Sequence, residues 1–139
     1  MRSVRVGLGM AVLAVLFAGA SAHADDPVTT SCKVTKTTIN GTGPYTIMAE
    51  GSISLSATEK GFLGVQYYVL ELADGGQTYY GFTNRPDGPP IPGMAAKKVT
   101  GSSPPFPRKG DYRVVFTMQY LDKDGAPKTI SGTTDVTVK

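Results

Sequence analysis

The sequence has 139 residues, with 14 Lys and Arg against 11 Asp and Glu, so its formal net charge is +3. It holds one His, one Cys and no Trp, whereas Gly and Pro are abundant at 17 and 10 residues. The length fits one domain, and the low His and Cys counts exclude a zinc cage and an internal disulfide.

The first 24 residues have the pattern of a secretory signal peptide. Arg2 and Arg5 precede an apolar run over residues 6–20, and the Ala-His-Ala of residues 22–24 matches a signal-peptidase site. The apolar run is shorter than the ~20 residues that a membrane-spanning helix needs. We therefore expect cleavage after Ala24, no membrane span in the mature chain, and export to the periplasm, the cell surface or the medium.

Removal of this leader changes the charge and the chemistry of the chain. Arg2 and Arg5 leave with it, so residues 25–139 carry 12 basic against 11 acidic side chains and no histidine. Nucleic-acid binding depends on concentrated positive charge, which a nearly neutral exported chain lacks. Without histidine, a Ser-His-Asp triad is excluded and the commonest metal ligand is missing. We expect no catalytic, cofactor-binding or metal-binding residues.

Alternation of apolar and polar residues predicts strands in the first half of the mature chain. A first strand is expected over residues 30–38. Residues 45–57 have apolar or small side chains at every odd position, which is the period of a half-buried strand. Met48 is the one apolar side chain at their even positions. Residues 65–72 are almost continuously apolar, as in a central strand buried on both faces.

Strand patterns continue to the end of the chain. A Gly-rich turn at residues 74–76 leads into an aromatic strand over residues 77–83, and a weaker strand covers residues 97–101. Residues 111–121 and 130–138 alternate again, joined by a hairpin turn that contains Asp124-Gly125. About seven short strands without helical periodicity predict a single all-β domain over residues 25–139, an immunoglobulin-like antiparallel β-sandwich.

The last two predicted strands carry a resemblance to a known superfamily. Lys109-Gly110-Asp111-Tyr112-Arg113-Val114-Val115-Phe116, the Asp124-Gly125 hairpin and Asp135-Val136-Thr137-Val138 resemble the end of immunoglobulin-like domains of secreted bacterial proteins. In that superfamily the tyrosine of G-x-Y-x-V bonds back to the backbone of the preceding corner, which implies this structural role for Tyr112. The chain lacks the Trp and the paired Cys of antibody-type members. The resemblance implies a fold and no particular ligand.

Cys32 is the single thiol and has two interpretations. In an oxidising compartment an unpaired Cys can link two chains as a dimer. Alternation places Cys32 on the same face as Thr30 and Val34, which favours a structural role as a small buried hydrophobe. A catalytic thiolate would need an activating base, and only lysines lie near in the sequence.

Two aromatic pairs fall on predicted strands: Tyr67-Tyr68 and Tyr79-Tyr80. Neighbouring residues of a strand point to opposite faces, so one member of each pair is expected inside and the other outside. An outward tyrosine beside a Pro-rich loop can stack on a sugar ring or contact a partner protein. Cross-strand pairing that only stabilises the sheet is the alternative.

Two Pro-rich loops, residues 84–93 and 102–110, are candidates for rigid recognition segments, including an inhibitor loop presented to a protease. Pre-set φ angles lower the entropy lost on binding, although rigid connections also stabilise a sandwich without any ligand. With the tyrosines, these loops supply the candidate partner-binding residues: Tyr68, Tyr79, Tyr80, Pro90, Ile91 and Phe106.

Antiparallel topology gathers alternate loops at the same end of a sandwich. Glu59-Lys60, Asp87 and residues 122–124 are expected at one end, where convergent carboxylates could bind Ca²⁺. Ordinary turn chemistry is the competing explanation, and the spacing lacks the acids of an EF-hand loop. Arg108 and Lys109 are expected at the opposite end, as a small basic patch or a plain solvated surface.

These patterns predict a small exported, non-catalytic binding or structural module whose partner is an unidentified protein or glycan. The first alternative is a protease-inhibitor-like protein that works through a Pro-rich loop. A hydrolase that uses carboxylates is a further alternative, with less in the sequence to support it.

Overall fold

The computed structural model describes residues 29–84 and 88–139, so the predicted leader and Asp87 lie outside the described residues. Within those ranges the chain forms strands and no helix, and therefore no helix that could cross a membrane. The eight strands are β1 (Ser31–Asn40), β2 (Thr46–Ser54), β3 (Gly61–Glu71), β4 (Thr78–Tyr80), β5 (Phe82–Asn84), β6 (Lys97–Ser102), β7 (Gly110–Leu121) and β8 (Pro127–Val138).

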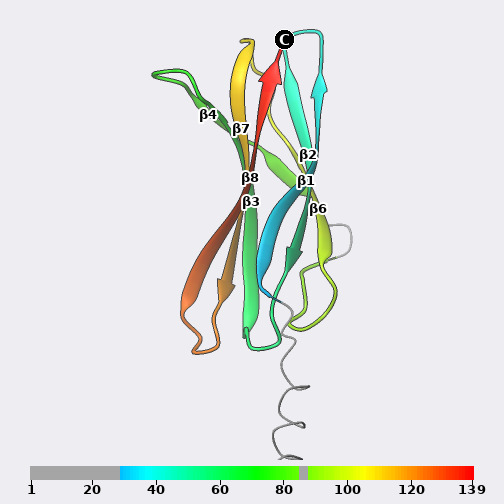
Figure 1. Cartoon of the computed structure of the whole chain (residues 1–139), viewed down its shortest axis with the longest axis vertical. Coiled ribbons are helices and arrows are strands. Elements are labelled where there is room, and N and C mark those ends of the chain that lie inside the picture. The colour runs from blue at the N-terminus through cyan, green and yellow to red at the C-terminus, as the bar shows by residue number, and fades with distance from the viewer. Residues whose placement is uncertain (1–28, 85–87) are drawn as a thin grey trace, which may run out of the picture.

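The strands form two antiparallel sheets that pack face to face as a sandwich (Figure 1). One sheet has the order β1-β2-β6-β5 and the other has the order β4-β3-β7-β8. This arrangement is the A-B-E-D and C-F-G order of immunoglobulin-like sandwiches, with the short β4 added beside β3. The predicted fold class is confirmed, with eight strands where about seven were expected.

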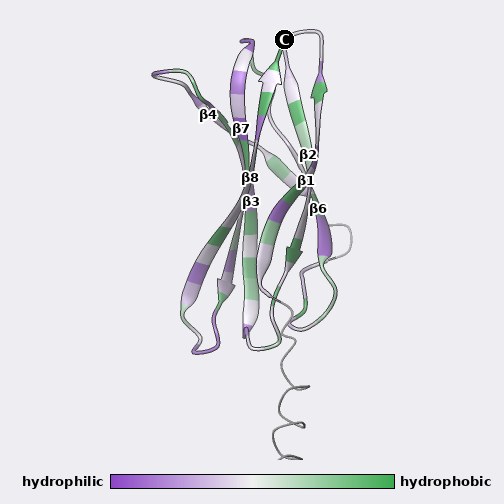
Figure 2. Ribbon diagram, viewed as in Figure 1, coloured by the Kyte–Doolittle hydropathy of each residue, from purple (hydrophilic) through white to green (hydrophobic). Residues whose placement is uncertain are grey.

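The predicted alternation is confirmed in the longest strands. Ile47, Ala49 and Ile53 of β2 are buried, as are Val114 and Phe116 of β7. Figure 2 shows the alternation as bands of green and purple along the ribbons. These side chains meet between the two sheets and form one hydrophobic core. Such burial stabilises the fold by about 25 cal/mol for each Å² of apolar surface removed from water.

Two even positions of the second predicted strand depart from the expected wet face. Ser54 and Ser56 are buried, with 5% and 7% of their surface exposed. Ser54 Oγ lies 2.8 Å from Ser31 Oγ and also donates to the carbonyl of Thr29. The first strand and the segment before it cover these serines, and hydrogen bonds compensate for the loss of water.

Tyr67 of β3 spans the space between the two sheets. Its side chain is fully buried, and its hydroxyl donates to the carbonyl of Ile47 in β2 at 2.9 Å. The ring lies against Gly101 of β6, where a Cβ would overlap ring atoms. Glycine is therefore needed at position 101 for the ring to lie across the opposite sheet.

The prediction that residues 65–72 are buried on both faces is wrong. Tyr67, Val69 and Glu71 face the core and are buried, whereas Tyr68 and Leu70 on the outer face are only partly covered. The described residues form two sheets only, so no third layer from this part of the chain covers the outer face of β3. Residues 65–72 are almost continuously apolar because apolar side chains also occupy the partly exposed outer face of β3.

The predicted aromatic strand over residues 77–83 is two strands in different sheets. β4 pairs with β3, and β5 pairs with β6 in the other sheet. Gly81 lies at the crossing, where its N–H donates to the carbonyl of Tyr67 at 3.0 Å. A side chain at position 81 would overlap the carbonyl of Ser102, so glycine permits the crossing.

The other side of the sandwich is closed by the first and last strands. Gly132 of β8 lies so close to the backbone of Cys32 and Lys33 in β1 that a Cβ at position 132 would overlap it. Two sheet edges are thereby covered by each other, which protects them from pairing with another chain.

Figure 1 confirms the expected grouping of loops at the two ends for the connections named below, whereas the expectation for Asp87 falls outside the described residues. The β1–β2, β3–β4 and β6–β7 connections lie at the end that holds the C-terminus. The β2–β3 and β7–β8 connections lie at the opposite end.

Candidate functional site

The outer face of the β1-β2-β6-β5 sheet carries two exposed apolar side chains in one cross-strand row. Met48 of β2 and Phe82 of β5 both pair with Ser102 of β6, one from each side. Thr38 of β1 extends the row, because it pairs with Met48. Phe82 is 82% exposed and Met48 is 48% exposed, so these groups meet the solvent on the sheet surface.

Two shallow hollows lie along this row and the next one. The first has a volume of about 250 Å³ and is lined by Met48, Phe82, Thr83, Asn84, Thr100, Gly101 and Ser102. The second has a volume of about 200 Å³ and is lined by Lys36, Thr38, Met48, Ala49, Glu50 and Thr100. Both contain Met48 and Thr100, so they adjoin and form one depression across the sheet, which we call the cross-strand groove.

Polar and charged side chains line the two ends of the groove. Thr100 Oγ1 donates to the carbonyl of Asn84 at 3.3 Å, which ties β6 to the edge strand β5. Lys36 and Glu50 are cross-strand partners, yet within residues 29–84 and 88–139 neither joins an ion pair. The groove therefore offers hydroxyl and amide groups at one end and two opposite, unpaired charges at the other.

The predicted tyrosines divide between the two faces as expected. Tyr67 and Tyr79 face the core, whereas Tyr68 and Tyr80 lie on the outer face of the β4-β3-β7-β8 sheet. The rings of Tyr68 and Tyr80 are 5.7 Å apart between centroids, and Tyr80 is 63% exposed. These two tyrosines make a cross-strand pair on the sheet opposite the groove. Tyr79 is partly buried, because its ring packs against the core while its hydroxyl donates to Gln77 Oε1 at 3.3 Å near the surface.

Phe106 is a correction to the predicted partner-binding set. Its side chain is fully buried, with the ring centroids of Tyr112 and Tyr79 at 4.7 and 5.3 Å. Its backbone exchanges two hydrogen bonds of 2.8 Å with Tyr45, which draws the Pro-rich loop inward. Phe106 closes the core at one end of the sandwich and cannot contact a partner.

Pro90 is a second correction, because it is buried within its loop. Ile91 is 55% exposed, as a recognition residue must be. The N–H of Met94 donates to the carbonyl of Ile91 at 3.0 Å, so residues 91–94 form a turn. A peptide recognised by strand addition is extended, and this turn therefore does not support an inhibitor loop at Ile91.

Tyr112 makes the contact that the resemblance implies. Its hydroxyl donates at 2.7 Å to the carbonyl of Arg108, which lies four residues earlier and just before β7. Burial raises the pKa of Tyr112, and the nearby Glu71 carboxylate raises it further. The hydroxyl therefore stays protonated and fixes the corner between β6 and β7.

Cys32 occupies a structural position in the core. Its side chain is 5% exposed, and its Sγ lies 3.5 Å from the carbonyl oxygen of Phe116. Burial raises the pKa of the thiol, which keeps it protonated and unreactive. A disulfide to a second chain would require β1 to open, so the geometry favours the structural interpretation.

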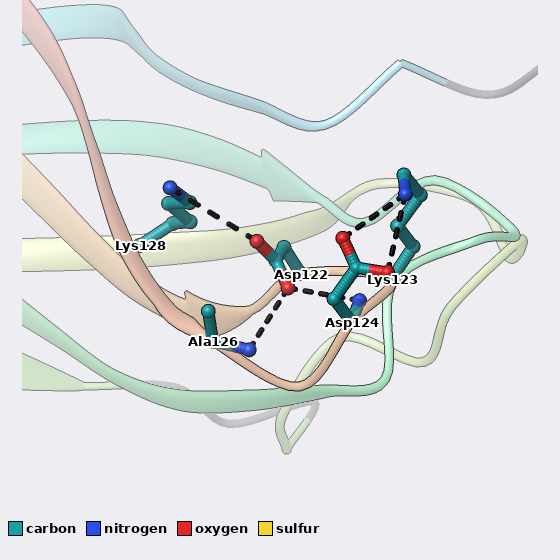
Figure 3. A network of polar contacts seen from close by, with 5 residues as sticks. All are labelled: Asp122, Lys123, Asp124, Ala126 and Lys128. Carbon is teal, nitrogen blue, oxygen red and sulfur yellow. Dashed lines mark hydrogen bonds and ion pairs between the residues drawn. The ribbon is translucent and has the colours of Figure 1, made fainter.

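The carboxylates of Asp122 and Asp124 bind groups within the β7–β8 turn itself, as Figure 3 shows. Asp122 Oδ1 accepts the N–H groups of Asp124 and Ala126 at 2.9 Å each, and Lys128 Nζ lies 4.0 Å from Asp122 Oδ2. The hydrogen bond from Ala126 is the main reason that the pKa of Asp122 is lowered. Among the described residues, no group of three or more His, Cys, Asp or Glu is placed to hold a metal ion.

Sequence reasoning missed Met48 and Phe82 as candidate site residues. Met48 gave a signal, because it is the one apolar residue on the polar face of its predicted strand. Phe82 belongs to the predicted aromatic strand over residues 77–83, but the pattern did not reveal that the chain changes sheets at Gly81, which places Phe82 on the other sheet. The fold and the groove define a β-sandwich with a shallow site on one sheet, and no protein-family model, curated protein or solved structure matches the chain.

Proposed function

We propose that the protein is a small exported, non-catalytic binding module and that its binding surface is the cross-strand groove. The observation that carries the proposal is the position of Phe82 beside a hollow on an open sheet face. It is the most exposed of the large apolar side chains in the described chain. Full burial of such a side chain is worth about 1.5–3 kcal/mol, which a ligand that covers the ring would recover.

Export of the module is supported by the leader pattern of residues 1–24 and by the superfamily resemblance at Tyr112. We further propose that the chain belongs with the immunoglobulin-like domains of secreted bacterial proteins, and its G-x-Y-x-V strand supports this proposal. N-terminal sequencing of the protein recovered from the cell envelope and the medium tests the export directly. The expected first residue is Asp25, and recovery of the uncleaved chain in the cytosol alone would contradict export.

Binding through the groove is tested by capture with matched variants. The exported protein, immobilised through its C-terminus, is exposed to cell-envelope and extracellular material of the source organism. Phe82→Ala is expected to abolish capture of the bound component, and Tyr80→Ala is expected to leave it unchanged. Tyr80 is the suitable control because it is an exposed aromatic residue on the opposite sheet. Equal capture by both variants would place the binding surface elsewhere.

A further inference from the structure

We infer that the cross-strand groove binds a neutral oligosaccharide, with one sugar ring stacked on Phe82 and a second ring beyond Met48. This inference rests on the proposed function and gives the chemical class of the ligand. It follows from the groups that line each hollow, from their size, and from the way the two hollows adjoin.

The hollow beside Phe82 combines one aromatic ring with uncharged polar groups. Its polar side chains on the outer face are the amide of Asn84 and the hydroxyls of Thr100 and Ser102, and none of its lining residues is charged. A sugar ring has an apolar face of C–H groups and an edge of hydroxyls. The ring of Phe82 suits the face, and amides and hydroxyls suit the edge because they both donate and accept.

The polar groups of this hollow retain hydrogen-bonding capacity. Thr100 Oγ1 donates to the backbone of β5, which leaves its lone pairs as acceptors. Ser102 Oγ makes only a long contact of 3.4 Å with the carbonyl of Ser103. The side-chain amide of Asn84 has no hydrogen-bond partner in the part of the chain that the structure describes.

The second hollow extends the site by one more unit. It begins at Met48 and Thr100, which it shares with the first hollow, and ends at Lys36 and Glu50. With no ion pair between them, the ammonium of Lys36 and the carboxylate of Glu50 are both available to hydroxyl groups. Their opposite charges cancel, so the groove favours a ligand without net charge.

The size of the hollows argues for single rings in sequence. Volumes of about 250 and 200 Å³ are below the roughly 300–1,000 Å³ of pockets that enclose a drug-sized ligand. A stable protein partner usually covers about 800 Å² with an apolar centre. Here the exposed apolar groups are one ring and one thioether, surrounded by hydroxyls and charges. A sugar chain lying across β5, β6, β2 and β1 fits this surface better.

Isothermal titration calorimetry of the exported protein with defined neutral oligosaccharides tests the inference. The probes are glucose, mannose, galactose and N-acetylglucosamine as monosaccharides and as oligomers of two to six units. At least one series is expected to bind, and the disaccharide should bind more tightly than the monosaccharide. Phe82→Ala is expected to weaken binding by at least about tenfold, because the stacked ring loses its apolar cover.

Three variants separate stacking from a change in fold. Phe82→Tyr keeps a ring and should retain binding, and Tyr80→Ala should bind as the wild type does. Lys36→Met should weaken the disaccharide and leave the monosaccharide unchanged. All these side chains are exposed or on the sheet surface, so urea unfolding should show little change in stability.

Three results would overturn the inference. If no probe binds at millimolar concentration while Phe82→Ala still abolishes capture of a protein, the binding module stands and its ligand is not a sugar. If a probe binds equally to the wild type and Phe82→Ala, the sugar site lies outside the groove. If neither probes nor capture depend on Phe82, the proposed function fails as well.

Discussion

The ring of Tyr67 lies against Gly101, in the space that a side chain at position 101 would fill. The two residues come from opposite sheets, since Tyr67 is in β3 and Gly101 is in β6. Gly101 also lines the hollow beside Phe82. One glycine therefore has the core tyrosine on one side and the candidate binding surface on the other.

Substitution of this glycine should be costly. Gly101→Ala places a methyl group inside the ring of Tyr67, and overpacking of this kind destabilises a protein by about 1–3 kcal/mol. The free energy of unfolding is measured by urea titration. Gly64→Ala in β3 is the control, because apart from the adjacent residues the described chain has no heavy atom within 4 Å of a Cβ there. An equal loss in both variants would contradict the close packing of Tyr67 on Gly101.

Stability should fall at alkaline pH through Tyr67. Burial raises the pKa of this tyrosine above its ordinary value near 10.0. Below that pH the phenol is protonated in both states and stability does not depend on it. At higher pH the unfolded chain releases the proton and the folded chain keeps it, so stability falls by up to about 1.4 kcal/mol per pH unit.

Tyr67→Phe isolates this effect. The variant loses the bond to Ile47 and about 1 kcal/mol at neutral pH, but its stability should fall less steeply at alkaline pH. The measurement is urea unfolding at a series of alkaline pH values. An identical pH slope in the wild type and Tyr67→Phe would show that other groups govern alkaline unfolding.

Removal of the Tyr112 hydroxyl should loosen the corner before β7. Tyr112→Phe loses the 2.7 Å bond to the carbonyl of Arg108, which should cost about 0.5–1.5 kcal/mol of stability. Tyr120→Phe on the same strand is the matched control, because the Tyr120 hydroxyl makes no hydrogen bond within residues 29–84 and 88–139. If other contacts fix the corner, Tyr112→Phe and Tyr120→Phe should show the same small loss of stability.

Cys32 should be protected from reagents in the folded protein. Its thiol is buried and its pKa is raised, so alkylation by iodoacetamide should be slow in buffer and fast in denaturant. Non-reducing electrophoresis should show a monomer for the wild type and for Cys32→Ser. A dimer band in the wild type alone would instead support a disulfide link between two chains.

The β7–β8 turn should weaken in acid through Asp122. Its pKa is lowered in the folded state, so the stabilising contribution is present above its ordinary pKa and is lost as pH falls through the folded value. Asp122→Asn keeps an oxygen that can accept the backbone N–H groups but cannot titrate. Its stability should depend less on pH below about 4 than that of the wild type.

The control for the turn is Asp124→Asn. The carboxylate of Asp124 contacts the ammonium of Lys123 and accepts no backbone hydrogen bond in the described chain. Both variants are compared by thermal unfolding between neutral and acidic pH. If only Asp124→Asn loses the acid dependence, the titrating group is Asp124, and the prediction for Asp122 is wrong.

Periodicity predicted which residues of a strand face inward, because burial on one face imposes a period of two. Ile47, Val114 and Phe116 follow from that rule alone. Periodicity carries no information on which sheet a strand joins. Tyr80 and Phe82 have the same parity and would share a face in one continuous strand. The crossing at Gly81 puts them on the outer faces of different sheets, which hid the groove from sequence reasoning.

The burial of Phe106 depended on a partner far away in the chain. Prolines on both sides of Phe106 are typical of an exposed loop. The ring is instead covered because Tyr45, immediately before β2, pairs with the backbone of Phe106 across the end of the sandwich. A contact between residues so far apart leaves no local pattern that a sequence reader could use.

The close approach of Gly132 to Cys32 has a consequence for how the molecule is made. The two residues are separated by 100 positions, so the seam between β1 and β8 can form only after nearly the whole chain is available. Contacts between residues so distant in sequence slow folding, because the chain loses the entropy of closing a long loop before the stabilising contacts form. During synthesis, the edge of β1 therefore stays uncovered until the last strand is available.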